Sequence, residues 1–226
     1  MAKIVVVGSC NIDITVECDR WAKPGETIFG NRLTVNPGGK GANQAVAAAR
    51  LGAEVKMVGC IGDDVYGQLV QKALKDNNVD ATYVKVLPGE NSGTAHITVA
   101  ENDNSIIVIK AANDLVSPAL IDEAWDAIKE ADIVLLQHEI PAATNAYVIE
   151  KCYEAGVPVM LNPAPVAPRR AAATAWLAPL PPGFTVRRLP KMVSPGLAQR
   201  SHSTVISILQ LPTTTIFAII LYLILV

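Results

Sequence analysis

The sequence of 226 residues predicts a doubly wound α/β fold, in which a mostly parallel β-sheet lies between two layers of helices. Two observations support this prediction. Short, continuously apolar runs such as 3–7 and 133–137 are typical of strands buried on both faces of a parallel sheet. Segments with helical periodicity separate these runs, and helices that connect parallel strands by right-handed crossovers produce a three-layer sandwich.

Capping residues locate the ends of the predicted helices. Asp63 or Asp64 is available as the N-cap of the second helix. Ser117 and Pro118 provide an N-cap and a first-turn proline for the third helix, and Gly156 closes the fourth. In order along the chain, we predict core strands at 3–7, 55–60, 82–86, 133–137 and 157–161, and helices at 41–51, 65–77, 117–130 and 142–154.

A glycine-rich segment, Pro-Gly-Gly-Lys-Gly-Ala-Asn-Gln at 37–44, leads into the first predicted helix. Because Gly38, Gly39 and Gly41 have no Cβ, the backbone can adopt positive φ and leave its N–H groups open to a small polar ligand at the positive end of the helix. A phosphate-binding P-loop is excluded, since Lys40 is followed by glycine rather than by Ser or Thr. The alternative interpretation is a tight turn that only starts the helix.

Two polar residues follow the first predicted strand. Asn11 and Asp13 come just past its carboxyl end, which is where ligands bind in open α/β sheets. Because they are two positions apart, an extended backbone points both side chains the same way, and an amide and a carboxylate match the hydroxyl groups of a sugar. A dinucleotide-binding site is disfavoured, since no Gly-x-Gly-x-x-Gly turn follows this strand.

Further motifs occur in a fixed order over residues 3–167. They are Val7-Gly8-Ser9 with Asn11 and Asp13, Pro24-Gly25-Glu26-Thr27, the glycine- and alanine-rich run 38–48, Gly62-Asp63-Asp64 with Gly67, Gly93-Thr94-Ala95, Gln137 with Glu139, and Asn162-Pro163-Ala164-Pro165. In this order they resemble the N-terminal part of the ribokinase/phosphofructokinase-B family of carbohydrate kinases.

The resemblance implies a kinase that transfers the γ-phosphoryl group of ATP to the primary hydroxyl of ribose or a related sugar, with Mg²⁺ and a monovalent cation as cofactors. Ribose is favoured because the run 38–48 resembles ribokinases more than adenosine or fructose kinases. The resemblance also implies the set of sugar-binding residues. These are Asn11, Asp13, Gly38, Gly39, Lys40, Asn43 and Glu139, with Ala95 and Ile97 lining the pocket from a lid.

This lid is a small β-sheet that closes over the sugar in the family, and two lids pack together in a dimer. Closure would keep water away from the reacting phosphoryl group. The alternation of apolar and polar residues at 95–99 fits strands with one wet face. We therefore predict lid strands at 14–17, 27–36, 94–99 and 105–109, and a homodimer or a pair with an intact kinase subunit formed through the lid.

The composition changes abruptly near Pro168. Residues 1–167 carry a net charge of −8, whereas 168–226 carry +6 with no Asp or Glu. This reversal, together with the loss of periodicity, favours an unrelated, low-information tail such as a frameshift would produce. A membrane anchor and a buried terminal element are the alternatives. The terminal apolar run of 11 residues is shorter than the ~20 that span a bilayer, so membrane association is not expected.

The family's catalytic base is the Asp of a Gly-Ala-Gly-Asp sequence at a helix start, and this sequence contains no such motif. We therefore expect no catalytic residue in this chain, a largely missing nucleotide site, a truncated sheet and an inactive protein as written. The alternative is a non-catalytic fragment that binds sugar or dimerises with a kinase. A sheet cut in half also predicts a bare edge at the strand 157–161 and poor folding.

The remaining composition predicts a cytoplasmic domain. We expect no secretory signal, because the first residues do not show a basic segment followed by an apolar core. The four cysteines are widely spaced and form no Cys-x-x-Cys pair, which indicates reduced thiols. His96, His138 and His202 have no metal-binding spacing, so no metal site is expected. The negative charge of residues 1–167 argues against nucleic acid as a partner.

Overall fold

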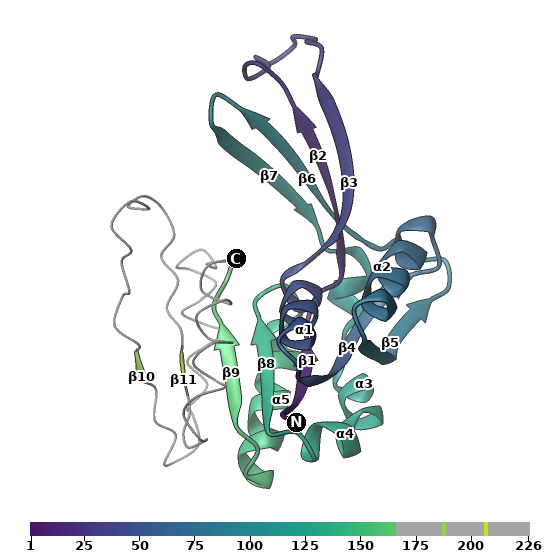
Figure 1. Ribbon diagram of the computed structural model, residues 1–226, viewed down its shortest axis with the longest axis vertical. Coiled ribbons are helices and arrows are strands. Elements are labelled where there is room, and N and C mark those ends of the chain that lie inside the picture. Colours follow the sequence, from purple (N-terminus) through teal and green to yellow (C-terminus); the bar gives the residue numbers. More distant parts are fainter. Residues whose placement is uncertain (166–186, 189–205, 208–226) are drawn as a thin grey trace.

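The computed structural model describes residues 1–165, 187–188 and 206–207, which Figure 1 shows in colour. Most of the predicted tail, including its apolar end at 216–226, lies outside the described residues. Within the described parts of the chain, no helix has both the length and the apolar composition needed to cross a bilayer. The core strands are β1 (Lys3–Val7), β4 (Glu54–Gly62), β5 (Val79–Leu87), β8 (Ile133–Gln137) and β9 (Val159–Asn162), and the α-helices are α1 (Lys40–Arg50), α2 (Val65–Asp76), α3 (Pro118–Glu123), α4 (Trp125–Lys129) and α5 (Ala142–Ala155).

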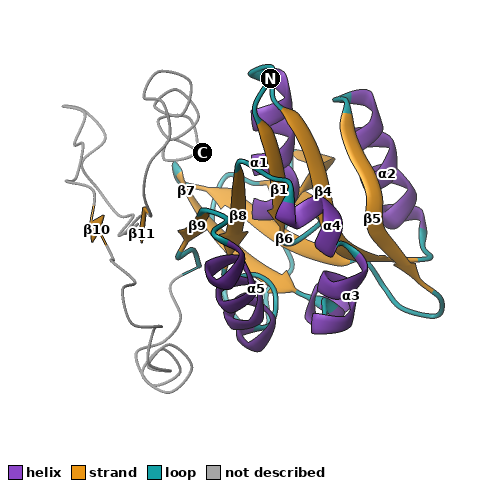
Figure 2. Ribbon diagram, turned by 90° about the horizontal axis from the view of Figure 1, so that it is seen from below, coloured by secondary structure: helices purple, strands orange, loops and turns teal. Residues whose placement is uncertain are grey.

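The five core strands form a parallel sheet with β1 at its centre. Their order is β9-β8-β1-β4-β5, and each neighbouring pair among them is parallel. In Figure 2, α1 and α2 lie on one side of this sheet, and α3, α4 and α5 lie on the other. The predicted doubly wound, three-layer architecture is confirmed.

Two apolar clusters join the layers, and β1 contributes to both. Val5 and Val7 pack with residues of α3, α4 and α5, whereas Ile4 and Val6 pack with residues of α1 and α2. All four side chains are at most 2% exposed. Side chains from Ile4 to Val7 point alternately to the two helix layers, and neither face of the strand meets water, which explains why all four residues are apolar.

The sheet continues past β9 with two short antiparallel strands, β10 (Arg187–Arg188) and β11 (Ile206–Ser207). Ile206 of β11 pairs with Leu161 of β9. The expectation of a bare edge at 157–161 is therefore wrong at this position. The sequence gives no signal for β11, because a strand of two residues is too short to show a period.

A second sheet projects from the body as the predicted lid (Figure 1). It consists of β2 (Asn11–Glu17), β3 (Arg32–Gly38), β6 (Gly93–Ala100) and β7 (Asp103–Ile109), in the order β3-β2-β6-β7. The inner strands β2 and β6 are parallel, and each outer strand is antiparallel to its neighbour. Because β2 begins at Asn11, the first two predicted site residues on the chain lie on a lid strand.

Two predicted elements have different bounds in the structure. The predicted lid strand 27–36 begins only at Arg32, because the Asn31 N–H donates to the Glu17 carbonyl oxygen at 2.7 Å and closes a loop before the ladder starts. The predicted helix 117–130 is divided at Ala124, which ends α3 and precedes α4 with φ −92° and ψ 2°. Since Ala124 and Ile128 are both fully buried, the division keeps both helices against the core.

The predicted helix caps are confirmed. The Asp64 carboxylate accepts the Gly67 N–H at 2.8 Å at the start of α2, and the Ser117 hydroxyl accepts the Leu120 N–H at 3.4 Å at the start of α3. Gly156 ends α5 in the left-handed conformation, with φ 73°. The caps could be predicted from the sequence because each capping residue is adjacent to its helix in the chain.

Candidate functional site

The candidate site lies where the order of the sheet reverses. From β1 the chain fills the sheet outward through β4 and β5 on one side, and later through β8 and β9 on the other. In open α/β sheets, ligands bind outside the carboxyl ends of the strands at such a point. Ser9 follows the end of β1 and Glu139 follows the end of β8, so both lie at this position.

The Glu139 carboxylate joins these two strand ends to the start of α1. The Ser9 hydroxyl donates to Glu139 Oε2 at 2.5 Å, and the Lys40 backbone N–H donates to the same oxygen at 2.9 Å. Lys40 Nζ lies 3.4 Å from Oε1. Glu139 is only 6% exposed, and these donors offset the cost of burying its carboxylate. It caps a helix whose own N-cap, Gly39, has no side chain.

The start of α1 also packs directly on the β1–β2 connection. The Gly41 N–H donates to the Ser9 hydroxyl at 3.3 Å, and the Ala42 N–H donates to the Ser9 carbonyl oxygen at 2.9 Å. With the Lys40 N–H bound to Glu139, the first N–H groups of the helix are occupied by protein atoms. The expectation that the backbone N–H groups stay open for a ligand is therefore wrong for Lys40, Gly41 and Ala42.

The glycines allow this close approach. Gly39 has φ 89°, and a Cβ there would lie 2.8 Å from the Asn11 backbone nitrogen. A Cβ on Gly38 would lie 2.2 Å from Asp13 Oδ2. The glycine-rich segment thus brings the helix and the lid strand β2 together, and the polar side chains of Lys40 and Glu139 remain to meet a ligand.

Asp13 adds a second carboxylate to the cluster. Burial raises its pKa, the negative charge of Glu139 raises it further, and the Lys40 ammonium opposes both effects. The cluster therefore holds two carboxylates and one ammonium group. Such an excess of hydrogen-bond acceptors suits a ligand that donates hydroxyl groups, and it disfavours a phosphate at the same position.

The other predicted residues lie around this cluster. Ala95 of β6 is the lateral neighbour of Asp13 and is buried, and half-buried Ile97 lies one step further out on the same face of the lid. Asn43 is exposed in the first turn of α1. The structure thus brings Asn11, Asp13, Gly38, Gly39, Lys40 and Glu139 together, places Ala95 beside them, and leaves Ile97 further out on the lid. Their roles as sugar ligands remain predictions.

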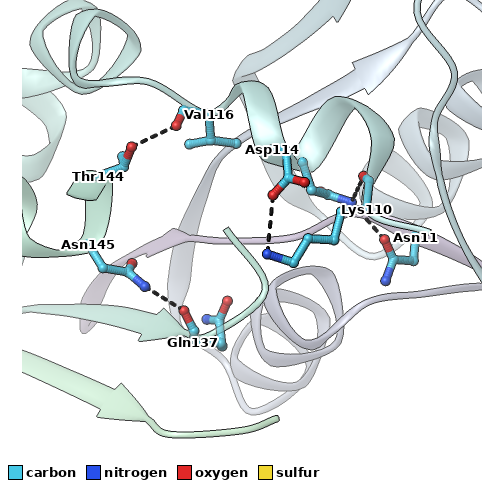
Figure 3. Close-up of polar contacts among 8 residues, drawn as sticks. Asn11, Lys110, Asp114, Val116, Gln137, Thr144 and Asn145 are labelled. Carbon is cyan, nitrogen blue, oxygen red and sulfur yellow. Dashed lines mark hydrogen bonds and ion pairs between the residues drawn. The ribbon is translucent and has the colours of Figure 1, made fainter. Parts of the chain in front are cut away.

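Sequence reasoning did not predict the buried polar side chains behind the cluster. Ser9 and Asn113 belong to this group, and so do Gln137 and Asn145. Gln137 Nε2 donates to Gln44 Oε1 at 2.6 Å. Asn145 Nδ2 donates to the Gln137 carbonyl oxygen at 2.7 Å, as Figure 3 shows. Ser9 and Gln137 carried a signal, because both belong to the motifs of the family resemblance, but the motifs did not give their hydrogen-bond partners. Asn113 bonds to Cys10 and Asn11, more than 100 residues away, so no local pattern marks it.

Cys10, next to the cluster, is a poor nucleophile. Burial, with a smaller effect from Cys60, raises the pKa of its thiol to about 12. The thiol is therefore neutral at physiological pH and packs as a small apolar side chain. Among residues 1–165, 187–188 and 206–207, no group of three or more His, Cys, Asp and Glu side chains could hold a metal ion.

Comparison with known proteins agrees with this geometry. The family model described as "pfkB family carbohydrate kinase" matches residues 1–179. A ribokinase of Bacillus subtilis is 49% identical over 168 residues, covering 74% of this chain and 57% of that protein. A ribokinase of Lactococcus lactis is 42% identical over 166 residues, covering 73% and 55% respectively.

A solved structure shares the fold. The Arabidopsis thaliana ribokinase complexed with ribose and ATP is 40% identical, with a TM-score of 0.64 over 71% of this chain and 53% of that one. The chain thus spans about half the length of the relatives that it matches. With the family model matched from residue 1 to residue 179, the chain belongs to the pfkB family of carbohydrate kinases.

Proposed function

We propose that this chain provides the sugar-binding half of a ribokinase-type kinase, which transfers the γ-phosphoryl group of ATP to the primary hydroxyl of ribose. The observation that carries the proposal is the cluster of Asp13, Lys40 and Glu139 at the reversal point of the sheet, at the base of the lid. Its acceptors match hydroxyl groups, and B. subtilis ribokinase is the relative that is 49% identical.

In this proposal each side chain has a separate task. The carboxylates of Asp13 and Glu139 accept hydrogen bonds from sugar hydroxyl groups, and Lys40 and Asn11 donate to hydroxyl oxygens. Asn43 reaches the sugar from α1. Gly38 and Gly39 admit the sugar close to the backbone, and Ala95 and Ile97 of the lid cover it. This arrangement fixes the sugar and excludes water from the hydroxyl that reacts.

ATP with Mg²⁺ supplies the phosphoryl group, and a monovalent cation is a further proposed cofactor. The negative charge of Asp13 and Glu139 disfavours a triphosphate in the cluster itself. The nucleotide therefore requires a separate site, which in the family belongs to the half beyond the matched residues. The 226-residue sequence contains no Gly-Ala-Gly-Asp motif, so we propose that this chain alone binds sugar in the cytoplasm without transferring phosphate.

A non-catalytic role as a dimerising subunit is the second candidate. Apolar side chains are exposed on one face of the lid, with Leu33 63%, Val35 41% and Ile107 68% exposed. The register of the lid strands places all three on the same face as Ile14. Such a patch fits a second lid, from another copy or from an intact kinase subunit. Sedimentation of the chain with and without Ile107→Lys tests this role, because a lid-mediated dimer would dissociate in the variant.

Thermal unfolding of the 226-residue chain with and without millimolar ribose tests sugar binding. A ligand that binds only the folded state raises the midpoint temperature, so the sugar-binding proposal, in contrast to the poor folding that the truncated sheet predicts, requires a cooperative transition that ribose shifts upward. Arabinose, which differs from ribose in the orientation of one hydroxyl, provides the control. A cooperative transition that ribose leaves unchanged would contradict the sugar-binding proposal. Formation of ADP from ATP on addition of ribose would contradict the proposed lack of transfer.

A further inference from the structure

Asn113 lies at the base of the lid with its side chain fully enclosed. It belongs to a short 3₁₀ helix, η1 (Ala111–Leu115), that follows the last lid strand. The residue is 1% exposed, and its amide group contacts three separate pieces of backbone and side chain around the start of β2 and the end of β7. No step of sugar binding described above uses it.

The contacts determine which way the Asn113 amide points. The Cys10 backbone N–H can only donate, so the Asn113 atom 2.8 Å from it must be the oxygen Oδ1. The amino group Nδ2 then faces three oxygen atoms. These are the carbonyl oxygens of Cys10 at 3.2 Å and of Lys110 at 3.0 Å, and Asn11 Oδ1 at 2.7 Å.

The same argument extends to Asn11. A side-chain atom that faces the Asn113 amino group must accept a hydrogen bond, so Asn11 presents its oxygen to Asn113 and turns its own amino group away. Figure 3 shows the oxygen of Asn11 on the dashed contact and the nitrogen pointing away from it. A Cβ on Gly93 would lie 2.2 Å from both Asn11 Oδ1 and Asn113 Nδ2, so this pair is tightly enclosed.

We propose that Asn113 is a positioning residue that fixes the Asn11 amide, so that Asn11 offers an N–H donor, and not an acceptor, to one hydroxyl oxygen of the ligand. The proposal rests on the proposed function, because it takes the ligand to be a sugar. Without Asn113, the Asn11 amide could rotate by 180° and offer either group. With Asn113 in place, the site requires a hydrogen-bond acceptor on the sugar at the position that meets Asn11.

Fluorinated sugars distinguish a donor from an acceptor in the site, because a C–F group accepts a hydrogen bond weakly and never donates one. The experiment measures dissociation constants of the 226-residue chain for ribose, for 2-deoxy- and 3-deoxyribose, and for the matching 2-deoxy-2-fluoro and 3-deoxy-3-fluoro sugars. For the hydroxyl that meets Asn11, the fluoro sugar should bind roughly threefold or more tighter than the deoxy sugar, as one weak hydrogen bond allows.

Asn113→Asp is the main variant. Its carboxylate keeps the acceptor for the Cys10 N–H but turns an acceptor toward Asn11, so the Asn11 amide should rotate and present its oxygen to the ligand. The preference for the fluoro sugar should then disappear or invert. Asn11→Asp should remove the same preference for the fluoro sugar. The double variant with Asn113→Asp should then bind the sugars as Asn11→Asp alone does. Thr144→Val is the matched control, since it removes one buried hydrogen bond, to the Val116 carbonyl at 2.7 Å, without touching Asn11.

A ligand-independent measurement separates this proposal from the proposed function. In the wild-type chain, the side-chain amide protons of Asn113 should exchange slowly with solvent by NMR, whereas those of Asn11 should exchange faster. If this holds and no sugar binds, the positioning by Asn113 stands and the sugar-binding proposal fails. Rapid exchange of the Asn113 amide would overturn the inference even if Asn113→Asp did not fold. An unchanged fluoro preference in a folded Asn113→Asp chain would also overturn it.

Discussion

At the scale of single residues, two neighbouring glycines serve different purposes. Gly38 has an ordinary φ, and its missing Cβ leaves space for the Asp13 carboxylate. Gly39 has φ 89°, and its missing Cβ leaves space for the backbone nitrogen of Asn11. A side chain can move away from a new methyl group, but a strand backbone in a hydrogen-bonded ladder cannot. The same substitution should therefore affect binding at one position and folding at the other.

We expect Gly38→Ala to fold with little change in the midpoint of urea unfolding, because only the Asp13 side chain must rotate. Displacing that carboxylate should weaken ribose binding at least about tenfold, or ~1.4 kcal/mol. Gly39→Ala is the comparison, and its left-handed φ and backbone clash should reduce the free energy of unfolding by about 1–3 kcal/mol or more. Titration calorimetry and urea unfolding measure the two effects. Equal loss of stability in both variants would contradict this assignment.

Asp13 should make the stability of the chain depend on pH. Its pKa is raised in the folded state, chiefly by burial and then by Glu139, so the folded chain holds this proton more tightly than the unfolded chain does. The free energy of unfolding should therefore fall as pH rises from the ordinary Asp pKa through the raised value. We expect Asp13→Asn to be more stable than wild type at pH 7, with a smaller difference at pH 4, and to bind ribose weakly.

Urea unfolding at both pH values provides the measurement, and exposed Asp63→Asn provides the control for removing a carboxylate elsewhere. The prediction would be contradicted if wild type were more stable than Asp13→Asn at pH 7, because the surroundings would then stabilise the charged carboxylate. The predicted gain in stability on losing a functional group is typical of sites in which charges are held close together for a ligand.

At the scale of elements, α1 depends on a cap from another part of the chain. Its N-cap residue, Gly39, offers no side chain, and Glu139 replaces the missing cap from the end of β8. Ser9 holds the same carboxylate oxygen at 2.5 Å. The helix start, the site carboxylate and two strand ends thus form one hydrogen-bonded unit.

Ser9→Ala should weaken this unit. The variant removes a donor from a carboxylate that is 6% exposed, and a buried hydrogen bond to a charged group is worth roughly 1.5–3 kcal/mol of unfolding free energy. Ribose binding should weaken as well, because Glu139 loses its fixed orientation. Ser117→Ala is the matched control, since it removes a cap from α3 at a cost of about 1 kcal/mol without affecting the site. Ribose affinity equal to wild type in Ser9→Ala would contradict the linkage.

Elements were predictable from the sequence where the determinants are local. The apolar run of β1 and the caps Asp64 and Ser117 needed only neighbouring residues, and the structure has them as predicted. The division at Ala124 involves no glycine or proline and could not be predicted. Glu139 was predicted as a site residue through its motif, but its capping of α1 depends on a contact across 99 residues.

At the scale of the whole molecule, the predicted architecture followed from the order of the elements alone. Strands separated by helices require a parallel sheet, and the reversal of its order places the site. The lid was predicted through the family resemblance, and its strands agree in number with the prediction. The contribution of β11 beside β9 could not be predicted, since pairing at the sheet edge depends on residues from the distant part of the chain.

The central position of β1 has a consequence for synthesis on the ribosome. β1 is made first and pairs on one side with β4, which ends at Gly62, but its other neighbour, β8, is complete only at Gln137. At a translation rate of about 5–20 residues per second, the apolar strand waits roughly 4–15 s with one edge unpaired. During this interval the nascent chain offers a site for chaperones, and slow codons between β4 and β8 should increase its aggregation.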